Sequence, residues 1–212
     1  MHIHTFGHSC LLVEQGDGRV LIDPGTFSHG FEQLTGLTAV LITHQHADHL
    51  DLSRLPAVVA ANPHALVASD AGSAVLLEQH GIEARVLRAN DELDLGLSLR
   101  VIGYEHAVVH PEIPVVPNVG LLLGAPGHRL FHPGDAHTVP DEPVDVLALP
   151  TAAPWTRVRE VVDHLRAVRP RLAVPIHDAI LRVPTMVHPM IAALAPAGTE
   201  FRAWPDDASL QV

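Results

Sequence analysis

The chain has 212 residues, of which 47% are hydrophobic and 17% are charged, and this length is sufficient for one domain with a sizeable core. No apolar run approaches the ~20 residues of a membrane-spanning helix, and the first residues lack the basic and apolar regions of a secretory signal. We therefore expect a cytoplasmic protein with no membrane partner. A formal net charge of −11 without any basic run argues against a long nucleic-acid partner. The single cysteine, Cys10, excludes an internal disulfide and any cluster of thiolate ligands.

The first half of the chain is predicted to begin with short strands joined by turns and to continue with alternating strands and helices. The segment "GDG" is typical of a hairpin, and the apolar run "AVLIT" indicates a buried strand. Asp70 is expected to cap a helix that Gly81 ends. The expected strands are residues 3–6, 10–15, 19–23 and 39–43, followed by an αβ step at 58–69 and the helix at 70–80.

The second half repeats this order loosely, and Pro170 is expected to end its first, amphipathic helix. The mixture of strands and helices predicts a single domain, residues 1–212, built from halves of about 1–95 and 96–212. In such a domain, two sheets pack face to face with the helices outside. The expected strands are residues 97–106, 119–124, 128–135, 144–150, 171–178 and 200–204, and the expected helices are 157–168 and 184–195.

The stretch "ITHQHADHL", residues 42–50, concentrates possible metal ligands directly after a buried strand, in a chain with 17 histidines. Residues two apart in an extended chain point to the same side, so His44 and His46 can bind one ion. Asp48 and His49 lie beyond a turn and can face a second ion. A lone histidine is usually only solvated or hydrogen-bonded. Burying several imidazoles and a carboxylate together, however, costs free energy of desolvation unless a bound ion compensates it. The spacing predicts two metal ions rather than one.

The motif "THQHADH" resembles the Thr-His-x-His-x-Asp-His signature of the metallo-β-lactamase superfamily, and "LIDPG", "FHPGDA" and "VPIHD" look like its remaining parts, in the expected order. The resemblance covers almost the whole chain and implies an α/β fold, a four-layer αββα sandwich. "FGHSC" near the start and the compact length look most like the small branch of predicted metal-dependent hydrolases that includes the ascorbate-6-phosphate lactonases. His8 in that motif is assigned no ligand role. The resemblance implies His44, His46 and His106 on a first metal, Asp48, His49 and His177 on a second, Asp135 between them, and Asp23 behind the ligands as a group that orients imidazoles.

The third ligand of the first metal is either His106 or His110. We favour His106, expected at the end of a strand, because strand ends hold ligands more precisely than loops do. His110 would then be a pocket residue in the stiff loop "HPEIPVVPN". Relatives often have Thr or Ser after Gly-Asp, whereas Ala136 and His137 follow here, so His137 either replaces that hydroxyl or faces solvent.

The resemblance implies a hydrolase in which two divalent ions, zinc before manganese or iron, activate a shared water as hydroxide. Asp48 would orient this hydroxide and take its proton, and His110 or His137 would protonate the leaving group. We expect a small-molecule substrate with an ester, lactone, amide or phosphodiester bond. The residues expected near its pocket are Phe27, Tyr104, His110, Glu112 and Trp155.

Two alternatives belong to other functional classes. A di-iron oxidoreductase of the same superfamily would usually accompany a flavin domain, and this chain has no glycine-rich flavin loop. A non-enzymatic metal-binding protein would be expected to lose ligands, whereas all seven candidates are present. The resemblance also suggests a homodimer.

Overall fold

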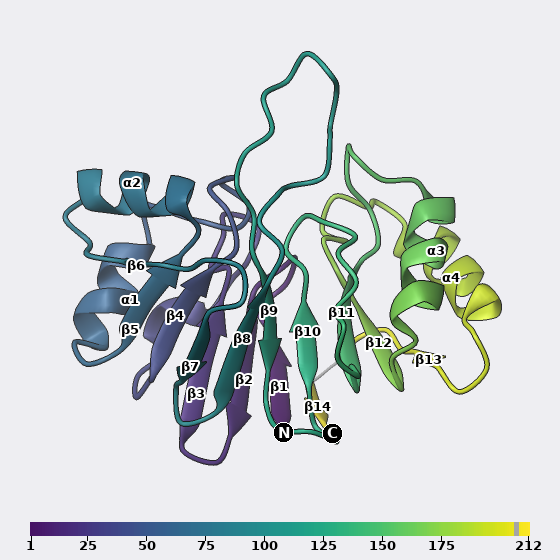
Figure 1. Cartoon of the computed structure of the whole chain (residues 1–212), viewed down its shortest axis with the longest axis horizontal. Coiled ribbons are helices and arrows are strands. Elements are labelled where there is room, and N and C mark those ends of the chain that lie inside the picture. The colour runs from purple at the N-terminus through teal and green to yellow at the C-terminus, as the bar shows by residue number, and fades with distance from the viewer. Residues whose placement is uncertain (206–207) are drawn as a thin grey trace.

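Two seven-stranded sheets lie between two pairs of helices in the computed structural model, which describes residues 1–205 and 208–212 (Figure 1). The first sheet has the strand order β14-β1-β2-β3-β4-β5-β6, and the second has the order β13-β12-β11-β10-β9-β8-β7. The strands of the first sheet are β1 (His2–Thr5), β2 (Leu11–Gln15), β3 (Gly18–Ile22), β4 (Ala39–Ile42), β5 (Leu66–Ser69), β6 (Arg85–Val86) and β14 (Ser209–Gln211). Those of the second are β7 (Glu92–Asp94), β8 (Ser98–Ile102), β9 (Gly120–Leu123), β10 (Leu130–His132), β11 (Val146–Pro150), β12 (Leu172–Ile176) and β13 (Glu200–Phe201).

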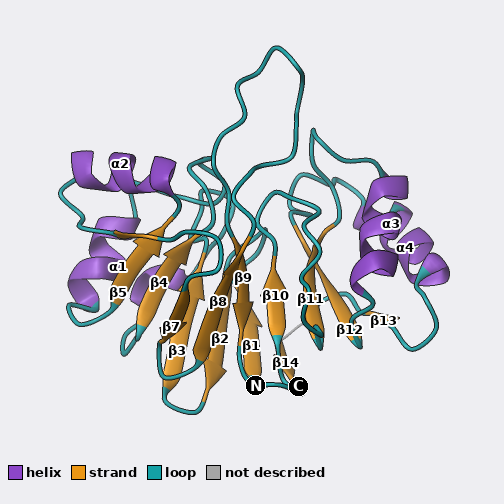
Figure 2. Cartoon of the chain, in the orientation of Figure 1, coloured by secondary structure: helices purple, strands orange, loops and turns teal. Residues whose placement is uncertain are grey.

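Helices cover the outer face of each sheet, as the colouring by secondary structure shows (Figure 2). The helices of the first half are η1 (Phe31–Gln33, a 3-10 helix), α1 (Leu55–Ala61) and α2 (Ala71–Gln79), and those of the second are α3 (Val158–Val168), η2 (Pro184–Met186, also 3-10) and α4 (His188–Leu194). Among the described residues, no helix is long and apolar enough to cross a membrane.

Alternation along the strands produces three apolar layers. Val20 and Leu41 point into a core between the two sheets, whereas Leu21 and Val40, their neighbours in sequence, point outward to a second core under α1 and α2. A third core lies between the second sheet and the helices α3 and α4. Strands buried on both faces therefore read as continuous apolar runs, and the four-layer αββα sandwich is the observed architecture.

The sheets change from antiparallel to parallel pairing near the metal-ligand motifs. In the first sheet β3, β4, β5 and β6 are parallel, and in the second β10, β11, β12 and β13 are parallel. The carboxyl ends of these strands meet at one edge of the molecule, where ligands commonly bind in sheets of this kind. Most of the long loops gather at this edge, at the top in Figure 2.

Local signals located several elements correctly. The Asp70 carboxylate accepts hydrogen bonds from Gly72 N–H (2.6 Å) and Ser73 N–H (3.2 Å) at the start of α2, and Gly81, with φ 74°, follows its end. Helix α3 ends before Pro170, as expected.

Other boundaries were wrong. The strand expected at 97–106 ends at Ile102, because Gly103 has φ 75° and turns the chain. The strand expected at 200–204 covers only two residues, and the helix expected at 184–195 is divided at Val187 into η2 and α4. The short strands β6, β7 and β14, which lie at or near sheet edges, were missed.

Candidate metal centre

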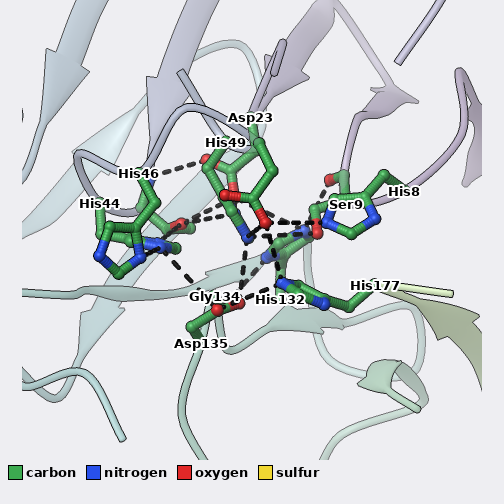
Figure 3. A network of polar contacts seen from close by, with 12 residues as sticks. His8, Ser9, Asp23, His44, His46, His49, His132, Gly134, Asp135 and His177 are labelled. Carbon is green, nitrogen blue, oxygen red and sulfur yellow. Dashed lines mark hydrogen bonds and ion pairs between the residues drawn. The ribbon is translucent and has the colours of Figure 1, made fainter. Parts of the chain in front are cut away.

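All the predicted ligands except His106, together with Asp23, follow the carboxyl ends of four strands. His44, His46, Asp48 and His49 follow β4, Asp23 follows β3, Asp135 follows β10, and His177 follows β12. Figure 3 shows His44 and His46 on one side of the network and His8 and His177 on the other, with His49 between them and Asp135 below. Parallel pairing within each sheet, and the packing of the two sheets against each other, thus bring together residues that are up to about 150 positions apart in the sequence.

Close backbone packing holds two of these loops against each other. A Cβ on Gly25 would lie only 1.8 Å from the Asp48 carbonyl oxygen, so no other residue fits there. The same loops are joined by hydrogen bonds from Thr26 N–H to Ala47 O (2.8 Å) and from Asp51 N–H to Pro24 O (3.0 Å). The motif "LIDPG" therefore fixes the position of the histidine cluster as well as contributing Asp23.

One group of four side chains has ligand atoms that all lie within 4.8 Å of one another: His44, His46, His106 and Asp135. His44 Nε2 lies 3.0 Å from His46 Nδ1, and His106 Nε2 lies 3.3 Å from Asp135 Oδ2. His46 is half-buried and the other three are buried. This is the set expected for a first metal, with the central carboxylate included.

A second group with the same spacing contains Asp48, His49 and His177, and also His8. His177 Nε2 lies 3.2 Å from Asp48 Oδ2 and 3.2 Å from Asp135 Oδ2, while His49 Nε2 lies 3.0 Å from Asp135 Oδ1. Asp135 thus contacts histidines of both groups. Its position between them is the one that the sequence assigned to a bridging carboxylate.

Hydrogen bonds behind the centre orient several of the rings. Asp23 Oδ2 accepts from His49 Nδ1 and Thr43 Oγ1, and Asp23 Oδ1 accepts from Thr43 N–H, each at 2.7 Å. His106 Nδ1 donates to Ala107 O (2.5 Å) and His177 Nδ1 donates to Ala152 O (2.7 Å). These acceptors place the Nδ1 proton on the outside and direct each Nε2 lone pair at the centre, as in metal-binding histidines.

Buried side-chain atoms without hydrogen-bond partners indicate that these residues fit a metal ion. His106 Nε2, His177 Nε2 and Asp135 Oδ1 are buried atoms without a hydrogen-bond partner among the described residues. Leaving such an atom unsatisfied costs about 1–3 kcal/mol each. Divalent cations would compensate these three atoms together, since all three are directed at one small space, and nitrogen and oxygen ligands suit zinc, manganese and iron.

The electrostatics of the metal-free chain agree with this. Burial would raise the pKa of Asp135, but the surrounding rings of His49, His106 and His177 lower it well below its usual range. Burial would lower the pKa of His177, but the neighbouring carboxylates of Asp135 and Asp48, each 3.2 Å from Nε2, raise it to about 9. In the metal-free chain the protonated histidines thus balance the carboxylate charge, and a bound cation would replace their protons.

His106 belongs to the first group, although the reason given for it was wrong. It lies four residues beyond the end of β8, in the long loop at the top of Figure 1, and is held there by His106 N–H to Val116 O (3.2 Å). His110 lies further along this loop, is exposed, and its ring accepts from Glu112 N–H (3.2 Å). The structure therefore brings His106 and not His110 to the centre.

The other predicted residues are placed around this centre. His137 is half-buried and helps to line a cavity of about 390 Å³. This cavity is formed by residues 103–108, which include His106, and by Ala136–Thr138. Phe27 is 47% exposed with its ring 5.2 Å from that of His8, and Tyr104 and Glu112 are exposed. Two contacts were missed: Trp155 Nε1–H donates to Asp135 Oδ2 (2.8 Å), and His8 joins the second group. The "GHSC" turn was the available signal for His8.

A sequence profile described as the beta-lactamase superfamily domain matches residues 2–177. Protein Rv0786c of Mycobacterium tuberculosis is 55% identical over 184 residues, which cover 85% of each chain. A UPF0173 metal-dependent hydrolase of Alkaliphilus metalliredigens is 28% identical over 84% of this chain and 85% of its own. The crystal structure of the metallo-beta-lactamase fold protein YhfI of Bacillus subtilis superposes with a TM-score of 0.75 at 15% identity, covering 99% of this chain and 98% of that chain. The protein therefore belongs to the metallo-β-lactamase superfamily, within its branch of small metal-dependent hydrolases.

Proposed function

We propose that this metal-dependent hydrolase uses two divalent ions to cleave an ester, lactone or phosphodiester bond in a small molecule. The observation that carries the proposal is the position of Asp135, whose carboxylate contacts His106 of one group and His49 and His177 of the other. One ion in each group, with this carboxylate between them, accounts for all seven predicted ligands. Ions held in this way would lower the pKa of a shared water toward about 7 and supply the nucleophile.

Asp48 is the residue that we propose as proton acceptor. Burial would raise its pKa, but hydrogen bonds from His177 and His8 lower it well below its usual range, so the carboxylate is ionised. Its side chain is 22% exposed, more than that of Asp135 at 3%. An ionised and partly accessible carboxylate can accept a hydrogen bond from a water directed at the substrate and orient it, but the lowered pKa makes it a weak base, so the proposed proton transfer rests on its position and accessibility.

His137 is the proposed proton donor for the leaving group. It lines the cavity beside His106, and its Nε2 lies 3.3 Å from Thr156 Oγ1, which orients the ring. His110 was the alternative, but it is exposed and contacts neither group. A group that returns the proton must lie beside the scissile bond, and this favours His137.

The charges around the cavity favour an ester or lactone over a phosphodiester. The described residues that line it carry no positive charge. Arg54, which reaches the Gly25 loop, is already paired with Asp51 and Glu32 and donates to two backbone carbonyls. A phosphoryl group would therefore have only the metals to balance its charge.

Metal analysis combined with a substrate screen tests the proposal. We expect the purified protein to hold about two zinc or manganese ions per chain, and we expect esters or lactones to be hydrolysed faster than phosphodiesters. Asp135→Ala should abolish turnover and lower the metal content. Two irons per chain with visible absorbance and oxygen-dependent turnover would instead support the oxidoreductase alternative. A single tightly bound ion in a fully active protein would refute the two-metal proposal.

A further inference from the structure

His8 lies in a tight turn between β1 and β2 whose backbone is under strain. Its φ is 52°, in the left-handed region that non-glycine residues rarely adopt, and Gly7 before it has φ 90°. Ser28 Oγ–H donates to Gly7 O (2.9 Å), and His177 N–H donates to His8 O (3.1 Å). The turn is therefore fixed by contacts with both halves of the chain, and such strain persists mainly where its surroundings require it.

The ring of His8 is enclosed by the second group. Its side chain has no exposed surface, and its centroid lies 4.1 Å from that of the His177 ring. His8 Nε2 lies 3.1 Å from Asp48 Oδ2. The same oxygen lies 3.2 Å from His177 Nε2, so His8 approaches Asp48 on the atom that also faces the centre.

The other ring nitrogen distinguishes His8 from the histidines of the two groups. His49, His106 and His177 each have an acceptor for Nδ1–H, which leaves Nε2 free to bind a metal. His8 Nδ1 is buried without a hydrogen-bond partner among the described residues. A proton on that nitrogen would be a buried, unsatisfied donor, so the favourable tautomer carries its proton on Nε2 and donates it to Asp48.

We propose that His8 is a positioning residue that holds the Asp48 carboxylate through an Nε2–H···Oδ2 hydrogen bond, and that it is not a ligand of the second metal. The proposal rests on the two-metal function proposed above. A carboxylate oxygen has two lone pairs, so Oδ2 can accept from His8 and still face the centre. The bond stops rotation of the one acidic side chain of the second group that is accessible to substrate.

Three variants test this role. His8→Ala removes the donor. His8→Gln keeps an N–H donor at nearly the distance of Nε2 from the backbone, and His128→Ala removes an exposed histidine from a turn distant from the centre as a matched control. Cobalt(II) titration with absorption spectra reports the number and coordination of bound ions without any substrate, and thermal unfolding shows whether each variant is folded.

We expect all three variants to bind two cobalt ions, as the unsubstituted protein does. His8→Ala should lose about 10- to 100-fold in kcat with little change in KM, the size typical of a lost partner behind a ligand, and His8→Gln should recover most of that loss. One cobalt ion instead of two in both His8 variants would show that His8 is a ligand and overturn the proposal. Unchanged kcat in His8→Ala would also overturn it. Fewer than two cobalt ions in the unsubstituted protein would refute the two-metal function itself, which is a different outcome. Should His8→Ala fail to fold, the number of cobalt ions bound by His8→Gln still decides whether His8 is a ligand.

Discussion

Replacing Asp23 by Asn should weaken the second metal site while preserving the shape of the side chain. Asp23 is fully buried and accepts three hydrogen bonds of 2.7 Å, two from Thr43 and one from His49 Nδ1. The side-chain oxygen of an asparagine can still accept from Thr43 N–H. Its NH₂ group then faces the other two partners, the Thr43 hydroxyl and His49 Nδ1. The Thr43 hydroxyl can rotate and accept, but His49 Nδ1–H then faces another donor.

His49 can respond in only two ways, and both weaken metal binding. It either loses its hydrogen bond, which is worth about 1.5–3 kcal/mol when one partner is charged, or moves the proton to Nε2, the atom that lies 3.0 Å from Asp135 Oδ1. Losing a partner of this kind typically costs 10- to 100-fold in metal affinity, or about 1.4–2.7 kcal/mol. The first group is connected to Asp23 only indirectly, through Thr43 beside His44 and through the contact of His49 with Asp135, and should lose less.

Competition with a chromophoric chelator measures both affinities. Asp145→Asn is the matched control, because Asp145 Oδ2 also accepts a backbone N–H, from Arg129 (2.9 Å), but belongs to neither group. We expect Asp23→Asn to show one weakened and one nearly unchanged site, and the control to show two unchanged sites. Two sites of unchanged affinity in Asp23→Asn would refute the assignment of Asp23 as the group that orients His49.

Three further predictions follow from single contacts. Trp155→Phe removes the indole N–H that donates to Asp135 but keeps an aromatic ring. This variant should lower kcat/KM by about tenfold and retain both metals. Loss of a metal would contradict a purely orienting role for Trp155. His106→Ala should lose an ion from the first site whereas His110→Ala should keep both, which elemental analysis distinguishes; the reverse result would overturn the placement of the first site. Burial lowers the pKa of His164 to about 3, so the unfolded chain binds one more proton than the folded chain between pH 3 and about 6.5. The free energy of unfolding should therefore fall as the pH drops below 6.5, by at most about 1.4 kcal/mol per pH unit from this residue. Urea unfolding of His164→Leu at pH 5 and 7 should show a weaker dependence of this free energy on pH than the unsubstituted protein. An unchanged pH dependence would mean that His164 is not buried in its neutral form.

The strand ends near the ligands were predictable because they depend on local patterns. Val40 and Leu41 are buried on opposite faces of the first sheet, so the apolar run ends where the chain reaches the polar edge, and His44 follows directly. The same reasoning located His177 after β12. It failed at His106, where a glycine with positive φ ended the strand early and a backbone hydrogen bond to Val116 supplied the position instead.

The sequence by itself determined the His44–His49 cluster and the packing of two sheets with helices outside, since periodicity and spacing are local properties, and its resemblance to the superfamily motifs implied the remaining ligands and their order along the chain. Only the tertiary structure decided which residues meet at Asp135. Trp155 and His8 reach the centre through irregular loops, and the conformation of such loops depends on contacts such as His177 N–H to His8 O between residues far apart in sequence. No periodic pattern encodes a contact of that kind, because it forms only after both sheets have packed together.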